Sequence, residues 1–571
     1  MATSILSSRR QNIRHRWPSR ENGFSSAALS QAPAPIAAGS EETIVFSGVA
    51  ARDEVAVRGP SGPMLKSAGQ NVIGQLASML VSIIDRVLVV GLLLRYWGPN
   101  RFSDWSILQA AAFLLSFAEL GVQIYLLNLE QSAFARKDRD GFARAVALAL
   151  GIYGALSVIL AVGLAITVLL VAPSIFALQT LDRPDARLIF LLLGFGVIVG
   201  MGQATTSSVY AATGRFARSV VLSALIQLAS TCATIAAILL GGGPVALAAV
   251  FFLVWGLGGP AASLFDMRRT TEWARVAPAF PNMRELRDGV RHVKWFAFQQ
   301  GAPVLWLQFP VMILNYFHLV GAPLASFLVL RTCANLVRQC ISFAVLGVGI
   351  EIATIMHRDN ERRALQLAQE TGTLISALSA AIAAVLLAMG APLIRHWTHD
   401  STLFDPSIAA LLVAPVLLTA PLLSIISLLQ FSNRSAAVGI PRLLQVAFGF
   451  FLCVAGAWRF GVVGAAAGLA LAETGALWLS LFFARGSFFG EWSVMTPYFL
   501  NAALAAIIGA SWSFLVAEAL QSIISPWSLS GFLVDLALWA ILAILPTGLL
   551  SLPSHARKRM MAAMIAHVDR P

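Results

Sequence analysis

The segment that decides the fold is APLASFLVLRTCANLVRQCISFAVLGVGI, residues 322–350. It is longer than the roughly 20 apolar residues that an α-helix needs to cross a bilayer. Its only charged side chains are Arg331 and Arg338. Each arginine costs about 2.5–3.5 kcal/mol at the centre of a membrane helix. A helix that carries two arginines must therefore offset this cost by interactions that the two side chains form inside the membrane.

The whole chain has the composition of a polytopic membrane protein. Of its 571 residues 58% are hydrophobic and 12% are charged, and the mean hydropathy is +0.76, which excludes an ordinary soluble protein of this length. Apolar runs of membrane-spanning length predict an all-α integral membrane protein with about fourteen transmembrane helices. The expected spans, numbered in chain order, are 70–95, 103–128, 145–172, 187–211, 218–240, 244–265, 295–318, 322–350, 370–394, 406–430, 438–460, 462–484, 496–518 and 528–550.

The net charge of +12 follows the placement of basic residues around the membrane. If the N-terminus lies in the cytoplasm, most Lys and Arg fall in cytoplasmic tails and loops, as the positive-inside rule requires. Both termini are then cytoplasmic, and so is the longest basic loop, 266–294. Because topology explains the positive charge, we expect no nucleic-acid partner.

The starting points of the spans indicate an internal duplication. The first six spans are followed by six that begin about 220 residues later, and the short gaps after spans five and eleven also correspond. An even number of spans gives both copies the same orientation, an arrangement found mostly in transporters. The predicted parts are a disordered basic cytoplasmic tail (1–66), an N-terminal six-helix lobe (67–265), a cytoplasmic linker (266–294), a C-terminal six-helix lobe (295–485), an additional helix pair (486–550) and a basic cytoplasmic tail (551–571).

The sequence contains no motif for catalysis or for cofactor binding. The four cysteines lie inside expected spans without CxxC spacing, so we expect neither disulfides nor metal ligands; they are Cys232, Cys333, Cys340 and Cys453. A nucleophile elbow, paired carboxylates, a metal cluster and a phosphate-binding glycine loop are all missing. We therefore expect no cofactor, no metal and no enzymatic activity.

Polar side chains follow one helical face in three of the expected spans. They are Asn71, Gln75, Ser78, Ser82 and Asp85, flanked by Arg86, in span one; Gln109, Ser116, Glu119 and Gln123 in span two; and Arg331, Asn335, Arg338 and Ser342 in span eight. A shift of about 222 residues places Gln109 on Arg331 and Ser116 on Arg338, so equivalent helices carry their polarity on equivalent faces. Since a polar stripe does not face lipid, these helices should enclose a wet or hydrogen-bonded interior.

Span seven adds two polar residues, Gln308 and Asn315, together with Pro303 and Pro310. A proline lacks the amide hydrogen of its helical turn, so we expect this helix to bend or break and to leave backbone carbonyls free. Broken membrane helices usually line cavities. Span seven is therefore expected beside the same interior.

Two interpretations of the buried arginines follow from the residues alone. In the first, Arg331 and Arg338 pair with Glu119, Asp85 or Glu473 and fix one lobe against the other. In the second, they line a water-filled cavity and receive an anionic substrate, since a guanidinium binds two phosphate oxygens at once. Asp85 and Glu119 are candidates for a proton- or sodium-linked step, and the alternative for both is a carboxyl group satisfied by hydrogen bonds.

The region 96–138, YWGPNRFSDWSILQAAAFLLSFAELGVQIYLLNLEQSAFARKD, resembles the region between the first and third helices of bacterial polysaccharide flippases. The shared features are a glycine-containing turn, an aromatic entry to span two, an acid directly before Leu-Gly (Glu119-Leu120-Gly121) and a basic loop. The stretch LIRHWTHD, residues 393–400, is similar to the family's Trp-containing loop after span nine. These O-antigen and exopolysaccharide flippases belong to the multidrug/oligosaccharidyl-lipid/polysaccharide exporter superfamily.

The resemblance implies two six-helix lobes around a cavity that opens alternately to the two sides of the bacterial inner membrane. It implies a lipid-linked oligosaccharide as substrate, carried on undecaprenyl diphosphate, with membrane lipids and a polysaccharide polymerase or export complex as further partners. Carried over to this sequence, Arg86, Arg331 and Arg338 would meet the diphosphate head group. Asn335 and Gln109 lie on the same faces and complete the candidate substrate-binding residues.

Three other functions are alternatives. A multidrug exporter of the same superfamily would differ in its substrate. A major-facilitator transporter also has two parallel halves, but its glycine- and arginine-rich signature is missing between spans two and three. An integral-membrane polymerase or glycosyltransferase would need a sizeable outer loop with catalytic residues, and the expected outer loops are all short.

Overall fold

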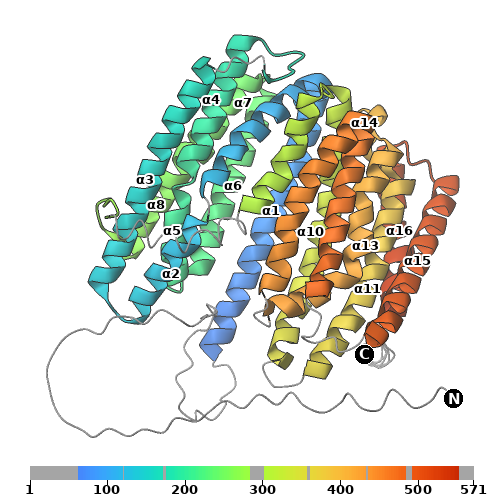
Figure 1. The fold of residues 1–571 in the computed structure, drawn as a ribbon. Coiled ribbons are helices and arrows are strands. Elements are labelled where there is room, and N and C mark those ends of the chain that lie inside the picture. Colours follow the sequence, from blue (N-terminus) through green and yellow to red (C-terminus); the bar gives the residue numbers. More distant parts are fainter. Residues whose placement is uncertain are drawn as a thin grey trace, which may run out of the picture. The chain divides into compact units, whose positions relative to one another are not determined.

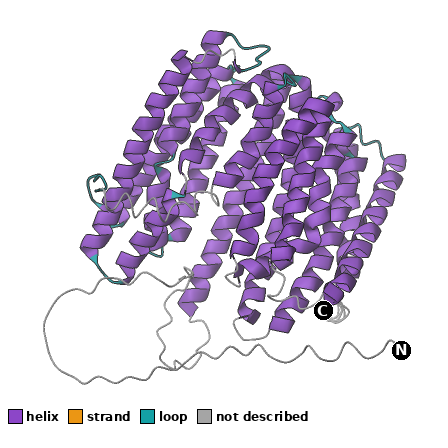
Figure 2. Cartoon of the chain, viewed as in Figure 1, coloured by secondary structure: helices purple, strands orange, loops and turns teal. Residues whose placement is uncertain are grey.

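The computed structural model describes residues 62–119, 121–170, 175–282, 301–356, 361–431, 435–483 and 492–551. Within these ranges the chain is helical, with no β-strand (Figures 1 and 2). The predicted tails 1–66 and 551–571 lie almost wholly outside the described residues, as do the end of the predicted linker and the side chains of Asn71 and Gln75. The all-α membrane fold predicted from the sequence is confirmed.

The N-terminal part of the chain supplies the expected spans one to six. Its helices are α1 (Gly62–Phe113), η1 (Leu114–Glu119), α2 (Val122–Ala135), α3 (Arg139–Leu170), α4 (Arg183–Gly200), α5 (Gln203–Ala212), α6 (Phe216–Leu239), α7 (Pro244–Val250), η3 (Phe251–Gly258), α8 (Gly259–Thr270) and η4 (Glu272–Ala274). Span one and the start of span two form the two arms of α1, which reverses at Gly98. Spans two, four and six are each built from more than one helical piece.

The C-terminal part supplies spans seven to fourteen. It contains a helix over 301–316, then α10 (Ala322–Met356), α11 (Glu361–Ala388), α12 (Gly390–Thr398), η5 (Ser401–Leu403), α13 (Pro406–Phe431), α14 (Ser435–Phe483), α15 (Trp492–Ile523), α16 (Leu529–Trp539), η6 (Ala540–Ile544) and α17 (Leu545–Ser551). Spans eleven and twelve form α14, which reverses at Gly461. The additional helix pair packs against α11 (Figure 1).

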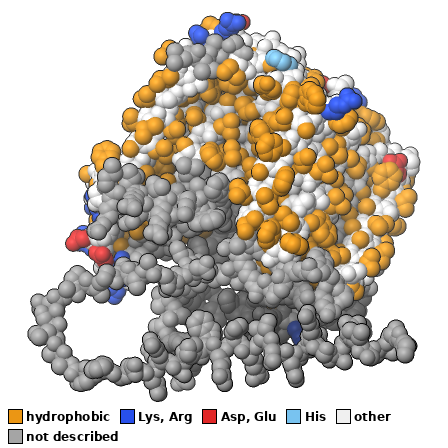
Figure 3. Space-filling model, in the orientation of Figure 1, with side chains coloured by type: hydrophobic (Ala, Val, Ile, Leu, Met, Phe, Trp, Pro, Cys, Tyr) orange, Lys and Arg blue, Asp and Glu red, His pale blue; other side chains and the backbone are white. Residues whose placement is uncertain are grey.

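Ten stretches of the described residues are long and apolar enough to cross a membrane, and one of them, Gly439–Phe483, holds both spans eleven and twelve. Large hydrophobic side chains such as Leu169, Phe451 and Leu515 are exposed along these helices. Figure 3 shows hydrophobic side chains over the middle of the visible face, with Lys and Arg near its edges. This is the surface expected of a protein surrounded by lipid. The total of fourteen spans stays a prediction.

Left-handed glycines mark equivalent turns in the two halves. Gly98 (φ 74°) and Gly321 (φ 73°) lie before spans two and eight, and Gly241 (φ 80°) and Gly461 (φ 63°) lie before spans six and twelve. Glycine adopts this conformation without steric cost, so it suits a sharp reversal between helices. In both pairs the second glycine follows the first by about 220 residues, which is the offset that a duplicated unit would produce.

The second helix of each half is tied to a loop further along the same half. In the first, the Asp104 carboxylate accepts hydrogen bonds from the backbone amides of residues 179–181 and from the Thr180 hydroxyl, at 2.7–3.2 Å. In the second, the Ser326 hydroxyl donates to the Leu403 carbonyl (2.8 Å). Both ends of the second tether follow the corresponding ends of the first by the same offset of about 220 residues. The tethers are therefore equivalent in position and different in chemistry.

Hydrogen bonds join the two halves near the turn at Gly321. The Asn315 side chain donates to the Ile175 carbonyl (3.2 Å) and accepts from the Ala177 amide (2.9 Å). The Ser103 hydroxyl accepts from the Gly321 amide (2.8 Å). A further bond runs from the Trp397 indole to the carbonyl of Val87 on α1 (2.6 Å). We call these four contacts the interlobe bonds.

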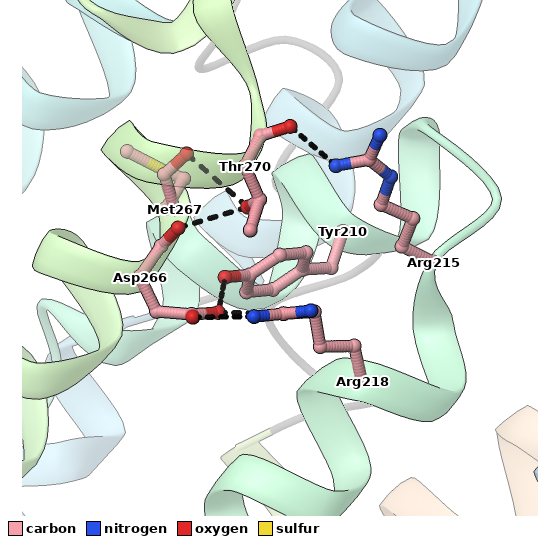
Figure 4. Close-up of polar contacts among 6 residues, drawn as sticks. All are labelled: Tyr210, Arg215, Arg218, Asp266, Met267 and Thr270. Carbon is pink, nitrogen blue, oxygen red and sulfur yellow. Dashed lines mark hydrogen bonds and ion pairs between the residues drawn. The ribbon is translucent and has the colours of Figure 1, made fainter.

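A salt-bridged group ties together α5, α6 and α8 (Figure 4). Arg218 forms two hydrogen bonds to the Asp266 carboxylate, at 2.7 and 2.8 Å, and the Tyr210 hydroxyl donates to the same group. Arg215 donates to the carbonyl of Thr270. These contacts hold the ends of spans four, five and six in fixed positions relative to one another.

Candidate functional site

The first buried arginine of span eight is bonded to the backbone of span seven. Arg331 is only 8% exposed, and its guanidinium donates to the carbonyls of Trp306 (2.7 Å) and Leu307 (2.8 Å). Pro310 has no amide hydrogen to give to Trp306, four residues earlier, so Arg331 supplies the missing donor. Trp306 thus has the free carbonyl that the prolines of span seven predicted. The helix does not break there, because it continues over 301–316.

The second arginine forms an ion pair inside the same half of the molecule. Arg338 lies 2.8 Å from the Glu473 carboxylate of span twelve, and the two side chains are 26% and 12% exposed. Arg338 also donates to the Asn335 side chain (2.7 Å) and to the Leu412 carbonyl (3.3 Å). Of the acidic partners that the sequence suggested, Glu473 is therefore the one that Arg338 contacts.

A third arginine, which the sequence reasoning missed, lies near this pair. Arg442 of α14 is exposed, donates to Gln445 (2.9 Å), and is within electrostatic range of both Glu473 and Arg338. Arg331 and Arg338 also interact electrostatically. We call Arg331, Arg338, Arg442 and Glu473 the arginine cluster. With three guanidinium groups and one carboxylate, it has a formal charge of +2.

The predicted residues of span one have different surroundings. The Asp85 carboxylate accepts a hydrogen bond from the Thr231 hydroxyl of α6 (2.7 Å) and interacts with the charge of the neighbouring Arg86. Arg86 is exposed, and Gln109 is half-buried. Asp85 is therefore a carboxylate with a hydroxyl partner and a nearby cation.

Glu119 lies at a pocket of about 350 Å³ in the N-terminal half. Its carboxylate accepts a hydrogen bond from the Tyr153 hydroxyl of α3 (3.0 Å). The other polar residues that line the pocket are Ser116, Gln123, Gln203 and Ser207, and aromatic side chains include Phe113 and Trp255. We call this space the Glu119 pocket. The predicted residues Ser116, Glu119 and Gln123 of the span-two stripe are thus brought together.

A second acid of span two, Glu130, was not singled out by the sequence reasoning. Its side chain is fully buried, and the Ser208 hydroxyl is the neighbouring group that interacts with its carboxyl group. It interacts electrostatically with Tyr153, which bonds to Glu119. The N-terminal half therefore contains Asp85, Glu119 and Glu130 as half-buried or buried acids, whereas arginines dominate in the C-terminal half.

Comparison with solved structures identifies the fold. A structure of the lipid II flippase MurJ in an inward closed conformation is 12% identical, with a TM-score of 0.61 over 82% of this chain and 98% of that chain. An inward-facing multidrug resistance MATE family transporter of the MOP superfamily is 14% identical, with a TM-score of 0.57 over 73% and 97% of the two chains. No protein-family model and no curated protein sequence matches. The chain thus has the fold of MOP-superfamily flippases and exporters.

Proposed function

We propose that this protein is a flippase that moves undecaprenyl-diphosphate-linked oligosaccharide units across the bacterial inner membrane for polysaccharide biosynthesis. The observation that carries the proposal is the arginine cluster, in which one guanidinium group is paired with the Glu473 carboxylate and two more lie within electrostatic range of it. An excess of positive charge within a membrane-spanning fold is costly unless an anion compensates it. A diphosphate has the charge and the paired oxygens that guanidinium groups bind.

The members of the cluster would have different tasks. Arg442 is exposed and Arg338 is partly exposed, so these two would contact the diphosphate directly. Arg331 already donates to two backbone carbonyls, so it would contribute mainly its positive charge. Asn335, through its bond to Arg338, would orient that guanidinium. Arg86 and Gln109, on α1, are proposed to contact the head group from the other half.

The proposal includes a direction in the membrane. With both termini cytoplasmic, as the positive-inside rule suggests, the turns at Gly98, Gly321 and Gly461 face the periplasm. The interlobe bonds near Gly321 would then hold the periplasmic side together while substrate enters from the cytoplasm. A polymerase or export complex would receive the flipped unit at the periplasmic side.

The first experiment is deletion of the gene, followed by analysis of surface polysaccharide and of the membrane face that holds lipid-linked units. We expect loss of surface polymer, with complete repeat units trapped on the cytoplasmic face. Units accumulating on the periplasmic face would instead identify a polymerase. An unchanged surface with altered drug tolerance would identify a multidrug exporter, the alternative that the similarity to a MATE transporter supports.

Complementation with Arg442→Gln then tests the arginine cluster. This variant removes a positive charge without breaking the Arg338–Glu473 ion pair, so the fold should persist. We expect export to fall by about tenfold or more, the effect of losing roughly 1.4 kcal/mol of binding free energy. Arg395→Gln is the matched control, since this exposed arginine lies over Trp527, outside the cluster. Normal export by Arg442→Gln would contradict the proposed role.

A further inference from the structure

The Glu119 pocket lies where three spans of the N-terminal half depart from regular α-helical geometry. Span two passes through the 3₁₀ helix η1 and resumes after Gly121, which has a left-handed conformation (φ 73°). Span four ends as α4 at Gly200 and resumes as α5 at Gln203, and span six contains the π-helix η3. Residues of all three irregular regions line the pocket. Irregular backbone is tolerated in a membrane protein where it lines a cavity, and π-helical turns are frequent at functional sites.

The pocket lies beside the C-terminal half of the molecule. The Phe117 ring of η1 packs against Gly301 of span seven, so closely that a side chain at position 301 would collide with it. Trp306 and Leu307, whose carbonyls bond to Arg331, follow five and six residues later on that helix, about 8–9 Å along its axis. The helix η1 thus contributes residues to the pocket and also contacts the helix to which Arg331 is bonded.

Two side chains of the pocket have hydrogen-bond acceptors to spare. Glu119 accepts one hydrogen bond, from the Tyr153 hydroxyl (3.0 Å), so the described residues leave most of the accepting capacity of its carboxylate unused. The Ser116 hydroxyl donates to the Phe113 carbonyl (2.7 Å), so it can only accept a further bond. Acceptors away from water are costly unless a donor reaches them. A ligand that fills the pocket should therefore donate hydrogen bonds.

Other side chains of the pocket have donors to spare. Ser207 accepts a hydrogen bond from the Ser219 hydroxyl (3.3 Å) and keeps its own proton to donate. The Gln203 amide nitrogen is buried without an acceptor among the described residues. Gln123 adds a second amide group, which can donate and accept. A ligand that complements the pocket must therefore accept as well as donate. Hydroxyl groups do both, whereas a metal cation or an ionised phosphate does not.

Aromatic rings give the pocket flat apolar walls. Trp255 stacks on Phe251, with 5.4 Å between the ring centres and 11° between the ring planes. The same indole lies so close over Gly200 that a side chain there would displace it. Phe113 also packs against Phe251, with 5.8 Å between the ring centres, and both Phe113 and Trp255 line the pocket. Flat aromatic surface beside hydrogen-bonding groups suits a ligand that has an apolar face and a polar rim.

We propose that the Glu119 pocket binds a neutral sugar ring of the oligosaccharide and so selects which lipid-linked units the protein accepts. This inference rests on the proposed flippase function. A pyranose ring has C–H faces that pack on aromatic rings and a rim of hydroxyls that both donate and accept. The pocket volume of about 350 Å³ lies at the lower end of the range for small-molecule sites, which suits roughly one or two sugar rings.

The charge of the pocket decides the class of sugar. Glu119 is its only charged lining residue, and no Lys, Arg or His lines it among the described residues. A uronic acid would bring a second carboxylate here without a cation to compensate it, whereas a neutral hexose or an N-acetylated amino sugar would not. The diphosphate is excluded for the same reason and would stay at the arginine cluster. Ser116 corresponds to Arg338 by the offset of the duplication, so the two sites lie at equivalent depths in their halves.

The test is binding of free sugars to the purified full-length chain, measured by tryptophan fluorescence and by saturation-transfer NMR. The probes are the methyl glycosides of N-acetylglucosamine, glucose, galactose, glucuronic acid and galacturonic acid. We expect saturable binding of at least one neutral glycoside, with a preference of about tenfold or more over the uronic acids. These probes carry no diphosphate, so the result does not depend on the arginine cluster. Loss of export in Arg442→Gln without any sugar binding would support the flippase and overturn only the sugar site.

Glu119→Gln tests the role of the carboxylate in this selection. It should weaken binding of the neutral glycoside by about tenfold and abolish the preference over uronic acids, a change that a merely structural role would not produce. Glu130→Gln is the matched control, since it alters a buried acid of the same span that does not line the pocket, and it should bind like the unaltered protein.

A second variant protects the test against misfolding. If Glu119→Gln unfolds at a lower temperature than the unaltered protein, Gln123→Ala takes its place, with a loss of sugar affinity of about threefold expected. The proposal is overturned if the unaltered protein binds no neutral glycoside, or binds the uronic acids equally well. It is also overturned if a folded Glu119→Gln variant keeps the full preference, or if the organic cation tetraphenylphosphonium binds in place of every sugar.

Discussion

The second helices of the two halves occupy equivalent places and have opposite chemistry. Span two is interrupted between η1 and α2 and carries Glu119 and Glu130, whereas span eight runs unbroken through α10 and carries Arg331 and Arg338. Asp104 and Ser326, at matching positions of the duplicated unit, tie both helices to equivalent loops.

The difference shows how a duplicated helix can keep its position while the chemistry of its side chains changes. The tether near one end fixes where each helix lies, and that contact persists although a carboxylate in one half corresponds to a hydroxyl in the other. The residues further along each helix do not take part in the tether, so they can differ between the two halves. Under the function proposed above, the arginines of the C-terminal half would bind the anionic head group.

The largest expected effect comes from breaking the ion pair of the C-terminal half. Glu473→Gln leaves the Arg338 guanidinium without its carboxylate in a largely buried place. We expect the free energy of unfolding to fall by about 3 kcal/mol, measured by unfolding of the detergent-solubilised protein. Adding Arg338→Gln should restore part of the loss. Glu518→Gln, on the exposed side of α15, is the control and should change little. If Glu473→Gln and Glu518→Gln changed the free energy of unfolding by the same amount, the Arg338–Glu473 pair would contribute no stability.

The next effect concerns the tether of the N-terminal half. Asp104→Asn replaces a carboxylate that accepts five hydrogen bonds by an amide with one acceptor oxygen. We expect a loss of about 2 kcal/mol in the same unfolding measurement. The exposed Asp185, changed to Asn, serves as the control. An unaltered unfolding curve for Asp104→Asn would mean that the loop is held by other contacts.

The equivalent tether of the C-terminal half should matter less. Ser326→Ala removes one neutral hydrogen bond to the Leu403 carbonyl, for which we expect a loss of about 1 kcal/mol. Ser342→Ala is a suitable control, because this exposed hydroxyl bonds only within its own helix turn. If Ser326→Ala lowered the free energy of unfolding as much as Asp104→Asn, the two tethers would be equally strong and the distinction between them would be wrong.

The smallest effect is expected at Glu130. Its carboxyl group is buried and interacts with the Ser208 hydroxyl, and an amide oxygen can keep that interaction, so Glu130→Gln exchanges groups of similar shape without leaving the hydroxyl alone. We expect a change in stability within about 0.5 kcal/mol. A large destabilisation would reveal a partner of this carboxylate beyond Ser208.

The sequence predicted the fold class well because membrane insertion leaves a strong signal. Runs of apolar residues define helices, and the spacing of spans indicated the duplication that the left-handed glycines match. The polar stripe of span eight was also visible. Glu473 was one of three candidate acids for these arginines. Which acid pairs with Arg338, and that Arg331 bonds to the carbonyl of Trp306, could not be predicted, because only packing brings these groups together.

The Glu119 pocket was not predictable in the same way. It depends on breaks in spans four and six, where the apolar run continues and gives no periodic signal. Glycine-rich stretches at 194–202 and 256–259 are the available hint, since Gly196 and Gly256 approach each other too closely for side chains. Glu130 was overlooked because span two was expected to end at residue 128, while α2 continues to Ala135.

The interlobe bonds have a consequence for the energy needed to separate the two halves. Four hydrogen bonds, each contributing about 0.5–1.5 kcal/mol net, amount to about 2–6 kcal/mol. One elementary charge that crosses a potential of about 100 mV releases roughly 2.3 kcal/mol. The two energies are of the same order. If separation moves one elementary charge through the electric field, the membrane voltage alone would shift how often this end of the protein opens.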